Sequence, residues 1–511
     1  MKPLLILAAA AGAAFAQLPF GPPQPSSTPQ AAILPASGRT SQTGSVGVAE
    51  QPVPGTTTSV NTLNPSVQIS GPYTGSAPST AVMPFNGKLS LQDALRRGLA
   101  YNLGAVGLAQ AVRQSGAQAA VARSALLPNL NGSLNETVEQ VDLAASGLRI
   151  NVPFFRIPQV VGPFNFFDLQ VSLNQVLANM TALNNYRAAG ATARASRFSL
   201  QDARDLITLA VGGAYLQVLA AQARLDAAQT QLATANAVFH QSTEQHAHGV
   251  VGKLSVDQNQ VRTLIQRQQI ITLRNDLAKQ KINLARLAGL PPNPSYVLTD
   301  TFSFRPAPVR TVEEAVAQAE QQRADLKAAQ AQVVAAEKAL AAARSERLPS
   351  LALSSAYEVI GLNPSQAHGA FTVAGTLSVP IYQGGRISSD IVQAQAVLAQ
   401  RRAELADLRG QIEAQVRQVY LDLEAAAGQV EVARKNLDVA RETLDMTRAR
   451  MQAGVINTLE VVQAQQTVAS AQLDLIDSVF AHNLAKLSLA RSLGNAPAQL
   501  PLLLKPTANS Q

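Results

Sequence analysis

The 511-residue chain contains no cysteine and no tryptophan. It therefore forms no disulfide and holds no iron–sulfur cluster or thiolate zinc site. Its net charge of +8 is modest, and the basic residues are interleaved with acidic ones along stretches of helical character. Nucleic-acid-binding proteins usually gather their basic residues on one patch with aromatic residues beside them. We therefore expect no nucleic acid among its partners.

The sequence also lacks the motifs of common catalytic sites. It contains no HExxH, no GxSxG and no pair of carboxylates that suggests acid–base catalysis. The stretch GVVGK at 249–253 lacks the spacing of a phosphate-binding loop and follows a helix rather than a strand. We predict that the protein is not an enzyme and uses no cofactor.

Long hydrophobic runs are scarce. The apolar stretch LLILAAAAGAAF follows Lys2 and leads into Ala14-Phe15-Ala16, which is the pattern of a cleavable export signal at 1–16. A short buried helix is the alternative. No other segment offers about 18 continuous apolar residues, the length that a membrane-spanning helix needs. No cysteine follows the signal, so an N-terminal lipoprotein is excluded.

The segment 17–87 is rich in proline, serine, threonine and glycine. Such a composition buries too little apolar surface to offset the entropy lost on ordering, so we expect this segment to be disordered or extended.

The rest of the sequence consists of two copies of one unit. The stretch that ends at Pro128 aligns without a gap to the stretch that ends at Pro349, and both read as alanine-rich helix. Each copy opens on a capping-box pattern, Ser90 with Asp93 and Thr311 with Glu314. The predicted boundaries are a first repeat at 88–290, a linker at 291–310, a second repeat at 311–495 and a C-terminal tail at 496–511.

After each Leu-Pro the hydrophobic period changes to two, which predicts strands. Apolar and polar residues alternate at 167–175, 351–359 and 371–381, and more weakly at 129–141, where Glu136 falls on the apolar face. Each copy therefore carries two strands. The loop after the first of them contains Phe154, Phe155 and Phe164. These rings fit a membrane-interface girdle or loop packing, with a ligand site outside the cell as the alternative.

A second helical arm follows each strand pair, from about 179 to 248 and from about 385 to 453. No proline interrupts either arm, and some seventy residues of helix reach roughly 100 Å. Gly249 and Gly454 end the arms as residues that accept a left-handed conformation, and a helix returns beyond each turn. Each copy is thus a long antiparallel helical hairpin with a sharp tip.

The four predicted strands each have one apolar and one polar face, as the strands of a membrane barrel do, but four strands are too few to form one. They cannot close a transmembrane barrel, because open edges in lipid leave backbone groups without hydrogen bonds. Three copies of the chain would supply twelve strands, which lies within the range of outer-membrane barrels. The alternative is a soluble two-stranded ribbon packed on helices.

These features resemble the TolC family of outer-membrane efflux proteins. The resemblance covers the chain from about Leu89 to Leu500 and rests on the tandem repeat, on LPNL and LPSL at the joints, on LSVPIYQGGR and on the tip RMQAGVINTLEVVQAQ. It implies a mixed, mainly α-helical α/β fold: a trimeric twelve-stranded barrel in the outer membrane, continuous with an α-helical barrel in the periplasm. The implied partners are two further copies of the chain, outer-membrane lipid, a periplasmic adaptor and an inner-membrane pump.

The resemblance also implies sites. An adaptor would dock at the hairpin tips, which comprise Gly249, Val250, Val251, Gly454, Val455 and Ile456. Acidic residues just past the second tip line a constricted entrance in such proteins, so we expect a periplasmic gate at Glu460 with Asp257 nearby. The helix dipole favours a negative charge in the first turn of a helix. The alternative is therefore that Glu460 is an ordinary solvated carboxylate.

Three histidines near the first tip, His240, His246 and His248, lie close to Glu244 and suggest a metal site. His240, Glu244 and His248 are spaced four residues apart on one helix face. Histidine near a helix C-terminus is favourable on dipole grounds alone, and we predict no metal.

Two classes of function remain. One is the channel subunit of a tripartite efflux or type I secretion system. The other is a periplasmic structural or adaptor coiled coil, which would carry one hairpin, β-rich flanking domains and a membrane anchor. The two hairpins and four amphipathic strands favour the channel; the exported substrate is left open.

Overall fold

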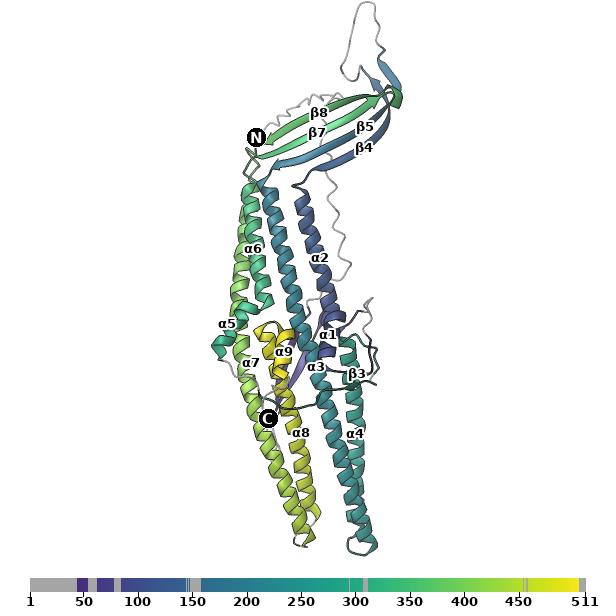
Figure 1. The fold of residues 1–511 in the computed structure, drawn as a ribbon, viewed down its shortest axis with the longest axis vertical. Coiled ribbons are helices and arrows are strands. Elements are labelled where there is room, and N and C mark those ends of the chain that lie inside the picture. The colour runs from purple at the N-terminus through teal and green to yellow at the C-terminus, as the bar shows by residue number, and fades with distance from the viewer. Residues whose placement is uncertain are drawn as a thin grey trace, which may run out of the picture. The chain divides into compact units, whose positions relative to one another are not determined.

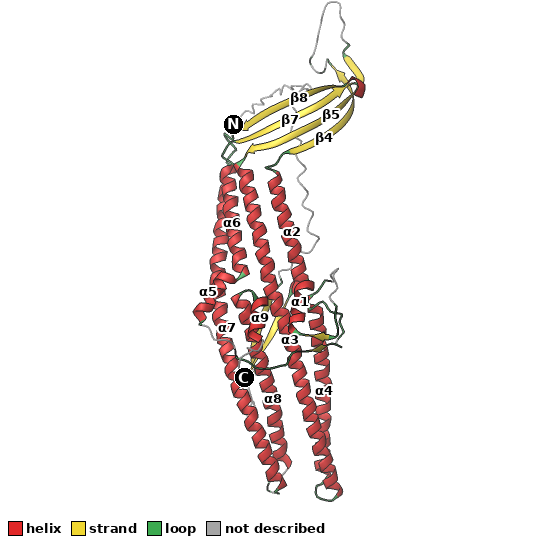
Figure 2. Ribbon diagram, in the orientation of Figure 1, coloured by secondary structure: helices red, strands yellow, loops and turns green. Residues whose placement is uncertain are grey.

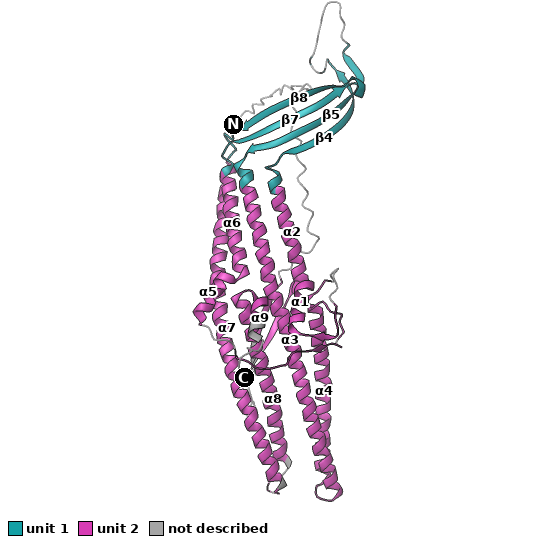
Figure 3. Cartoon of the chain, in the orientation of Figure 1, with its two compact units in different colours: residues 1–40, 122–183, 345–384 teal, residues 41–121, 184–344, 385–511 magenta. Residues whose placement is uncertain are grey.

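The computed structural model describes residues 44–53, 62–77, 84–143, 145, 147, 158–293, 295–306, 311–453, 455 and 458–504. They fall into two compact units, coloured separately in Figure 3. One unit contains residues 122–183 and 345–384, which form a sheet, and the other contains the remaining helices. The predicted signal peptide at 1–16 lies outside the described residues.

The same order of elements occurs twice along the chain (Figures 1 and 2). The first half comprises α1 (Leu91–Tyr101), α2 (Leu103–Ser124), β4 (Asn129–Asp142), β5 (Val160–Ala178), α3 (Met180–Ala247) and α4 (Lys253–Leu287). The second half comprises α5 (Val312–Gln322), α6 (Ala324–Ser345), β7 (Ser350–Gly361), η2 (Pro364–Gln366), β8 (His368–Ser378), α7 (Arg386–Gln452) and α8 (Thr458–Leu493). The remaining elements are β1 (Val46–Val53), β2 (Thr62–Ile69), η1 (Gly71–Thr74), β3 (Lys88–Leu89), β6 (Val297–Leu298) and α9 (Ala496–Leu504). The fold is mainly helical with a smaller share of sheet, as the sequence predicts.

The sheet is antiparallel with the order β4-β5-β7-β8. Its register places most apolar residues of the four strands on one face. Leu134 lies opposite Leu169, Leu169 opposite Val359, and Tyr357 opposite Phe371. Glu136 lies opposite Phe167 on this face, which is the irregularity expected there. Most of these apolar side chains are exposed within the single chain.

The two long arms agree with the predicted arms to one residue at each end. The helix α3 contains 68 residues and α7 contains 67. At 1.5 Å per residue each is about 100 Å long. Along α7 the side chains of Leu437, Ala440 and Leu444 are buried, and the first two form a cluster with Ala471 of α8. Alanine at this seam allows the two helices of the hairpin to approach closely.

The N-terminal helix of each half is broken, although the sequence predicts it as continuous. Asn102 separates α1 from α2 and Arg323 separates α5 from α6, and both have extended backbones, with ψ of 131° and 127°. Asn102 is buried, accepts the Gly104 N–H at 2.9 Å and donates to the Tyr73 carbonyl at 2.8 Å. A buried polar side chain that satisfies backbone groups therefore makes this break, and it leaves no signal in hydrophobic periodicity.

Part of the segment 17–87 is ordered, in contrast to the prediction of a disordered or extended segment. Strands β1 and β2 form an antiparallel hairpin, and η1 follows them. Val46 and Tyr73 are buried in the main core. Val67 of β2 lies so close to Gly213 of α3 that a Cβ there would stand 2.3 Å from its Cγ2. A glycine on the helix thus lets the strand pack against it and gain apolar burial that the composition argument did not count.

The described part of the segment between the two halves is held by strand pairing and hydrogen bonds. Its β6 pairs in parallel with β3. The Asp300 carboxylate accepts the Leu91 N–H at 2.7 Å and the Tyr215 hydroxyl at 2.6 Å. Two lysines at equivalent positions of the two return helices donate to carbonyls of the segment, Lys281 to Tyr296 at 3.0 Å and Lys486 to Arg305. The linker is therefore part of the helical unit's packing.

Among the described residues, α3 is the one helix long and apolar enough to cross a membrane by length and composition. Of its most apolar window, 72% is buried inside the chain. Packing within the protein accounts for this composition, because α3 supplies much of the main core.

Candidate functional site

The first hairpin tip is a turn closed by backbone hydrogen bonds. Gly249 has φ of +72°, which suits glycine. Its N–H donates to the His246 carbonyl at 2.9 Å, and the Val250 N–H donates to the Gln245 carbonyl at 2.8 Å. This pair of bonds is a Schellman motif, so the predicted role of Gly249 as a helix stop is confirmed. Val250 is exposed and Val251 is partly buried.

The second tip has a related turn. The helix α7 ends at Gln452, and the Val455 N–H donates to the Arg450 carbonyl at 3.0 Å. This bond spans the same number of residues as the one from Val250 in the first tip. Val455 is exposed. Gly454 and Ile456 lie outside the described residues, so their place at the tip stays a prediction.

The histidines near the first tip take part in local packing. His246 Nδ1 lies 2.8 Å from the Val251 carbonyl, which ties the helix end to the turn. The His240 ring stacks at an angle on the neighbouring Phe239 ring, with 6.2 Å between centroids. Within the part of the chain that the structure describes, no three metal-ligating side chains come together.

A cavity of about 830 Å³ lies between the two hairpins near their tips. Its lining comes from α3, α4, α7 and α8, and includes Leu254, Asp257, Arg262, Arg448 and Leu459. Burial lowers the pKa of Arg262. The wall mixes apolar side chains with glutamine, threonine and a few charged side chains, a lining that suits non-covalent contact with a helix or a passing solute.

The two predicted gate residues occupy different places. Asp257 is exposed in the first turns of α4 and forms part of the cavity wall. Glu460 is exposed in the first turn of α8, and it is not among the cavity-lining residues. The two residues thus lie in the first turns of different helices, and the gate stays a prediction.

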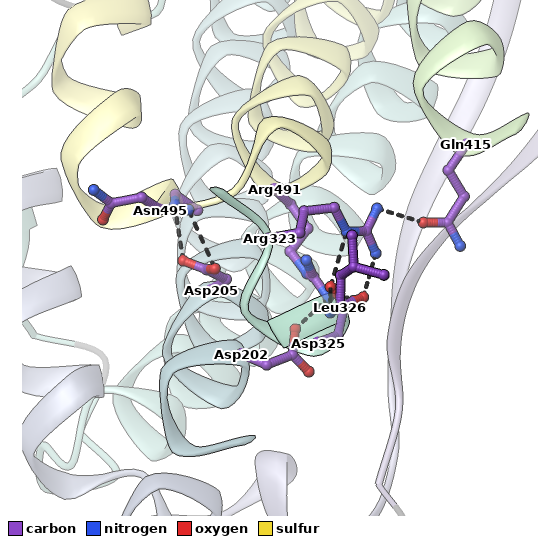
Figure 4. A network of polar contacts seen from close by, with 9 residues as sticks. Asp202, Asp205, Arg323, Asp325, Leu326, Gln415, Arg491 and Asn495 are labelled. Carbon is purple, nitrogen blue, oxygen red and sulfur yellow. Dashed lines mark hydrogen bonds and ion pairs between the residues drawn. The ribbon is translucent and has the colours of Figure 1, made fainter. Parts of the chain in front are cut away.

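A buried polar network joins the two halves of the helical unit (Figure 4). Arg491 of α8 donates to Asp202 of α3 at 2.5 Å and lies 3.8 Å from Asp325 of α6. Arg323 makes two hydrogen bonds to Asp325, at 3.1 and 2.6 Å, and also donates to Gln415 of α7 at 2.8 Å. Four long helices are thus fixed to one another through two guanidinium groups.

The beginning of α9 is tied to the same region. Asp205 accepts the backbone N–H groups of Asn495 at 3.3 Å and Ala496 at 2.8 Å (Figure 4). Burial raises the pKa of Asp205 to about 6 despite these bonds. Burial also raises the pKa of Asp202, against the opposing effect of Arg491. Burial acts on Asp325 in the same direction, but hydrogen bonds and charge from Arg323 outweigh it and lower that pKa.

Sequence reasoning missed this network because its acids are far apart in the chain. The repeat did offer a signal, because Asp202 of the first copy aligns with Asp407 of the second. An acidic residue that recurs at the same place in both copies indicates a partner for its charge.

A second group of buried charges faces the linker. His482 and Lys486 lie one turn apart on α8, and both are almost fully buried. Burial and the charge of Lys486 lower the pKa of His482 to about 4, and the Phe304 ring lies 4.6 Å from the imidazole, centroid to centroid. Burial and nearby Arg305 lower the pKa of Lys486 to about 8. These side chains position the linker.

A four-stranded antiparallel sheet with an exposed apolar face, joined to two long helical hairpins, is the subunit fold of outer-membrane channel proteins. Three solved structures show this likeness in fold. CusC has a TM-score of 0.67 at 18% identity, covering 79% of this chain and 92% of that one. VceC of Vibrio cholerae scores 0.66 at 17%, covering 79% and 96%. The MtrE channel of Neisseria gonorrhoeae scores 0.66 at 16%, covering 82% and 94%.

The model of the outer membrane efflux protein family matches residues 106–290 and 315–495, which is more than half of the chain. The chain therefore belongs to this family and is a protein of the outer membrane that extends into the periplasm. The predicted resemblance to TolC-type channels is confirmed, and the family and the structural neighbours are channel proteins rather than enzymes.

Two curated relatives are similar over part of their length. Both are named pyoverdine export outer membrane protein OpmQ. The protein of Pseudomonas aeruginosa is 26% identical over 285 residues, which is 55% of this chain and 58% of that one. The protein of Pseudomonas putida is 26% identical over 297 residues, which is 56% and 60%. The chain thus spans about three fifths of the length of these relatives.

Proposed function

We propose that three copies of the chain form an export channel across the outer membrane, the outer component of a tripartite efflux or type I secretion system. The observation that carries this proposal is the exposed apolar face of the sheet in a chain that also has two helical hairpins. Leu130, Leu134, Phe371, Val373 and Leu377 all leave most of their side-chain surface uncovered on that face. Lipid is the environment in which such a face is favourable.

Closure of the sheet requires other copies. Strands β4 and β8 are the two edges of the four-stranded sheet. Neighbouring strands are antiparallel throughout, so β4 and β8 run in opposite directions. The β8 edge of one copy can therefore pair in antiparallel fashion with the β4 edge of the next. Three copies then give a closed barrel of twelve strands with no free edge in the bilayer.

The hairpins form the periplasmic part in this proposal. Six hairpins from three chains make an α-helical barrel, with the tips at 249–251 and 454–456 at the end of the arms opposite the strands. A periplasmic adaptor docks on these tips and joins the channel to an inner-membrane pump. Exposed valines at both tips support a docking role, because an apolar side chain without a partner is favourable only when covered.

The alternative of a periplasmic adaptor coiled coil fits less of the molecule. An adaptor needs one hairpin and soluble β-rich domains. This chain has two hairpins, and its sheet carries an apolar face that a soluble protein would have to cover. Since two relatives are named for pyoverdine export, pyoverdine is the first substrate to test.

Assembly provides the test of this proposal. In detergent extracts of outer membranes, chemical cross-linking is expected to give a ladder of bands that ends at three subunits. The purified protein is expected to conduct ions in planar lipid bilayers. Recovery of the mature protein as a monomer in the soluble periplasmic fraction would contradict the proposal.

A separate prediction concerns the gate. In a threefold assembly three Glu460 carboxylates surround one axis, where like charges attract cations. We expect Glu460→Ala to remove sensitivity to divalent cations added on the periplasmic side of a planar bilayer and to weaken cation selectivity. Asp257→Ala is expected to act in the same direction if its carboxylate also faces the axis.

Glu442→Ala serves as the matched control, since Glu442 is an exposed acid on α7 away from the tip turns. It is expected to leave both properties unchanged. A Glu460→Ala channel that keeps its divalent block and selectivity would place the constriction at other residues.

A further inference from the structure

The wall of the cavity near the tips contains buried polar groups that the chain leaves unpaired. Asn259 is 4% exposed, and its Nδ2 group has no hydrogen-bond partner within the described part of the chain. The buried Oε1 atom of Gln266 also lacks a partner there. Both residues line the cavity. A buried polar group without a partner destabilises a fold, so both groups become more favourable if a bound molecule supplies the missing hydrogen bonds.

The second hairpin shows that a hairpin of this kind can form without these amides. Counted from the glycine of each tip, Asn259 corresponds to Ala464 and Gln266 corresponds to Ala471. Ala471 is buried in a cluster with Leu437 of the opposite helix, so alanine suits the contact between the two helices of a hairpin. The first hairpin carries two unpaired amides at the same places, at a cost in stability. Their presence therefore indicates a role other than packing.

A cation lies between the two amides on the same face of α4. Asn259, Arg262 and Gln266 are spaced three and four residues apart, so their side chains follow one stripe of the helix. Among the described residues, no hydrogen bond or ion pair holds the Arg262 guanidinium, and burial lowers its pKa. The other arginine of the cavity wall, Arg448, is paired with Asp445 at 3.4 Å. Arg262 is therefore the positive charge that remains open to a bound molecule.

The rest of the cavity wall narrows the class of ligand. Six glutamines and one asparagine line the cavity, together with apolar side chains from all four helices. Amide side chains both donate and accept hydrogen bonds, so they suit a molecule that carries amide groups of its own. Among the described lining residues, Asp257 is the one carboxylate, and with Arg262 and Arg448 it gives a net charge of +1. The volume of about 830 Å³ lies within the range of small-molecule sites.

We propose that this cavity binds a small anionic solute that carries amide groups. Arg262 pairs with the anionic group, and the side chains of Asn259 and Gln266 exchange hydrogen bonds with the amides of the solute. The proposal rests on the proposed function in one respect, because a solute bound near the tips is cargo at the entrance of the channel.

A helix of a partner protein fits the unpaired amides less well. The backbone N–H and C=O groups of a helix are already bonded to each other, so a helix offers only its side chains. A short flexible solute presents free amide groups, and these can reach both Asn259 and Gln266. The unpaired amides therefore favour a small solute as the occupant.

Calorimetry on the detergent-purified protein tests the class of ligand. The probe is the acidic tripeptide acetyl-Glu-Gln-Glu, and it is expected to bind. Two further probes each lack one feature: the neutral peptide acetyl-Gln-Gln-Gln-amide has no charge, and octanoate has a charge but no amide. Both are expected to bind about tenfold more weakly, the loss typical of one hydrogen bond to a charged group. Equal affinity for all three probes would overturn the assignment of the ligand class.

Substitution of the arginine tests its role in binding. Arg262→Gln keeps a polar side chain but removes the charge, and it is expected to weaken binding of the acidic tripeptide about tenfold. Arg267→Gln is the matched control, because Arg267 is an exposed arginine of α4 that does not line the cavity. The control is expected to bind the tripeptide as the native protein does. Native affinity in Arg262→Gln would overturn the pairing of Arg262 with the anionic group.

A second variant separates binding from packing. Asn259→Ala together with Gln266→Ala copies the residues of the second hairpin and removes two unpaired groups. It is expected to keep or raise the native melting temperature and to weaken binding of the tripeptide about tenfold. A variant that melts at a lower temperature and binds the tripeptide with native affinity would show that the amides serve the fold, which overturns the proposal.

The proposed site and the proposed function can fail separately. A native protein that forms a conducting trimer but does not bind the acidic tripeptide would overturn the site and leave the channel intact. A protein that binds the tripeptide but neither assembles nor conducts ions would overturn the proposed function and leave the binding site.

Discussion

Placing aspartate at both tips, Val250→Asp together with Val455→Asp, is expected to abolish export while leaving the trimer and its membrane insertion intact. Both valines are exposed at turns, so the fold loses little; surface changes of this kind usually alter stability by less than about 0.5 kcal/mol. An adaptor that covers the tips would have to bury two unpaired carboxylates. That costs several kcal/mol, and every ~1.4 kcal/mol lowers affinity about tenfold.

Export of pyoverdine or a test compound by cells that carry the variant gives the measurement, with trimer content in detergent as the check on folding. Val439→Asp is the matched control, since Val439 is an exposed valine on α7 that is remote in sequence from both tips. The control is expected to export normally. Normal export by the double tip variant would show that the adaptor binds elsewhere on the hairpins.

The long-range outline of the molecule was open to prediction because periodic patterns report on it. Two unbroken helical arms follow from the absence of proline and from apolar spacing over some seventy residues. The apolar face of the sheet follows from the alternation of apolar and polar residues along each strand. The charged residue on that face, Glu136, was also visible in the sequence, because it interrupts a run of apolar side chains. Such features depend on residues that are close together in the sequence, so a single sequence is enough to predict them.

Contacts between segments that are far apart in the sequence were harder to predict. The break at Asn102 depends on the carbonyl of Tyr73, and the hairpin of β1 and β2 depends on Gly213 in α3. A composition rich in proline and serine predicts disorder because it counts the apolar area within the segment alone. Val46, Val48, Val67 and Ile69 do alternate with other residues in two short runs, and this pattern was the available signal for a hairpin.

The tips show the limit for the candidate site. Glycine at a helix end predicts the turn, and the structure gives Gly249 the left-handed backbone expected of it. The gate is a different matter, because Glu460 and Asp257 could meet their counterparts only around a symmetry axis. A single sequence shows that Glu460 is acidic and lies in the first turn of a helix. The distance between the carboxylates of different copies depends on the assembly.

The core of the helical unit is expected to be most sensitive at Arg491. Replacement by methionine keeps much of the packing volume but leaves Asp202 and Asp325 without their shared guanidinium. Removing one partner of a buried ion pair typically costs about 3–5 kcal/mol, because the remaining charge stays buried. We expect Arg491→Met to lower the melting temperature of the protein more than any single exposed ion-pair deletion. Arg224→Met is the control, since its pair with Asp477 is partly exposed and such pairs contribute about 1 kcal/mol or less.

The pH dependence identifies the cause of that loss. Burial already raises the pKa of Asp202 in the folded protein, and Arg491 opposes this rise, so its removal raises the pKa further. An acid whose pKa is higher in the folded than in the unfolded state stabilises the fold at low pH, and this contribution is lost as the pH rises through the folded-state pKa. The deficit of Arg491→Met relative to the native protein is therefore expected to be small near pH 4 and to grow towards pH 8, as measured by melting temperature. Adding Asp202→Asn to Arg491→Met removes the buried charge and is expected to recover part of the loss at pH 8. A deficit that is the same at both pH values, and unchanged by Asp202→Asn, would show that Arg491 acts through packing rather than through its charge.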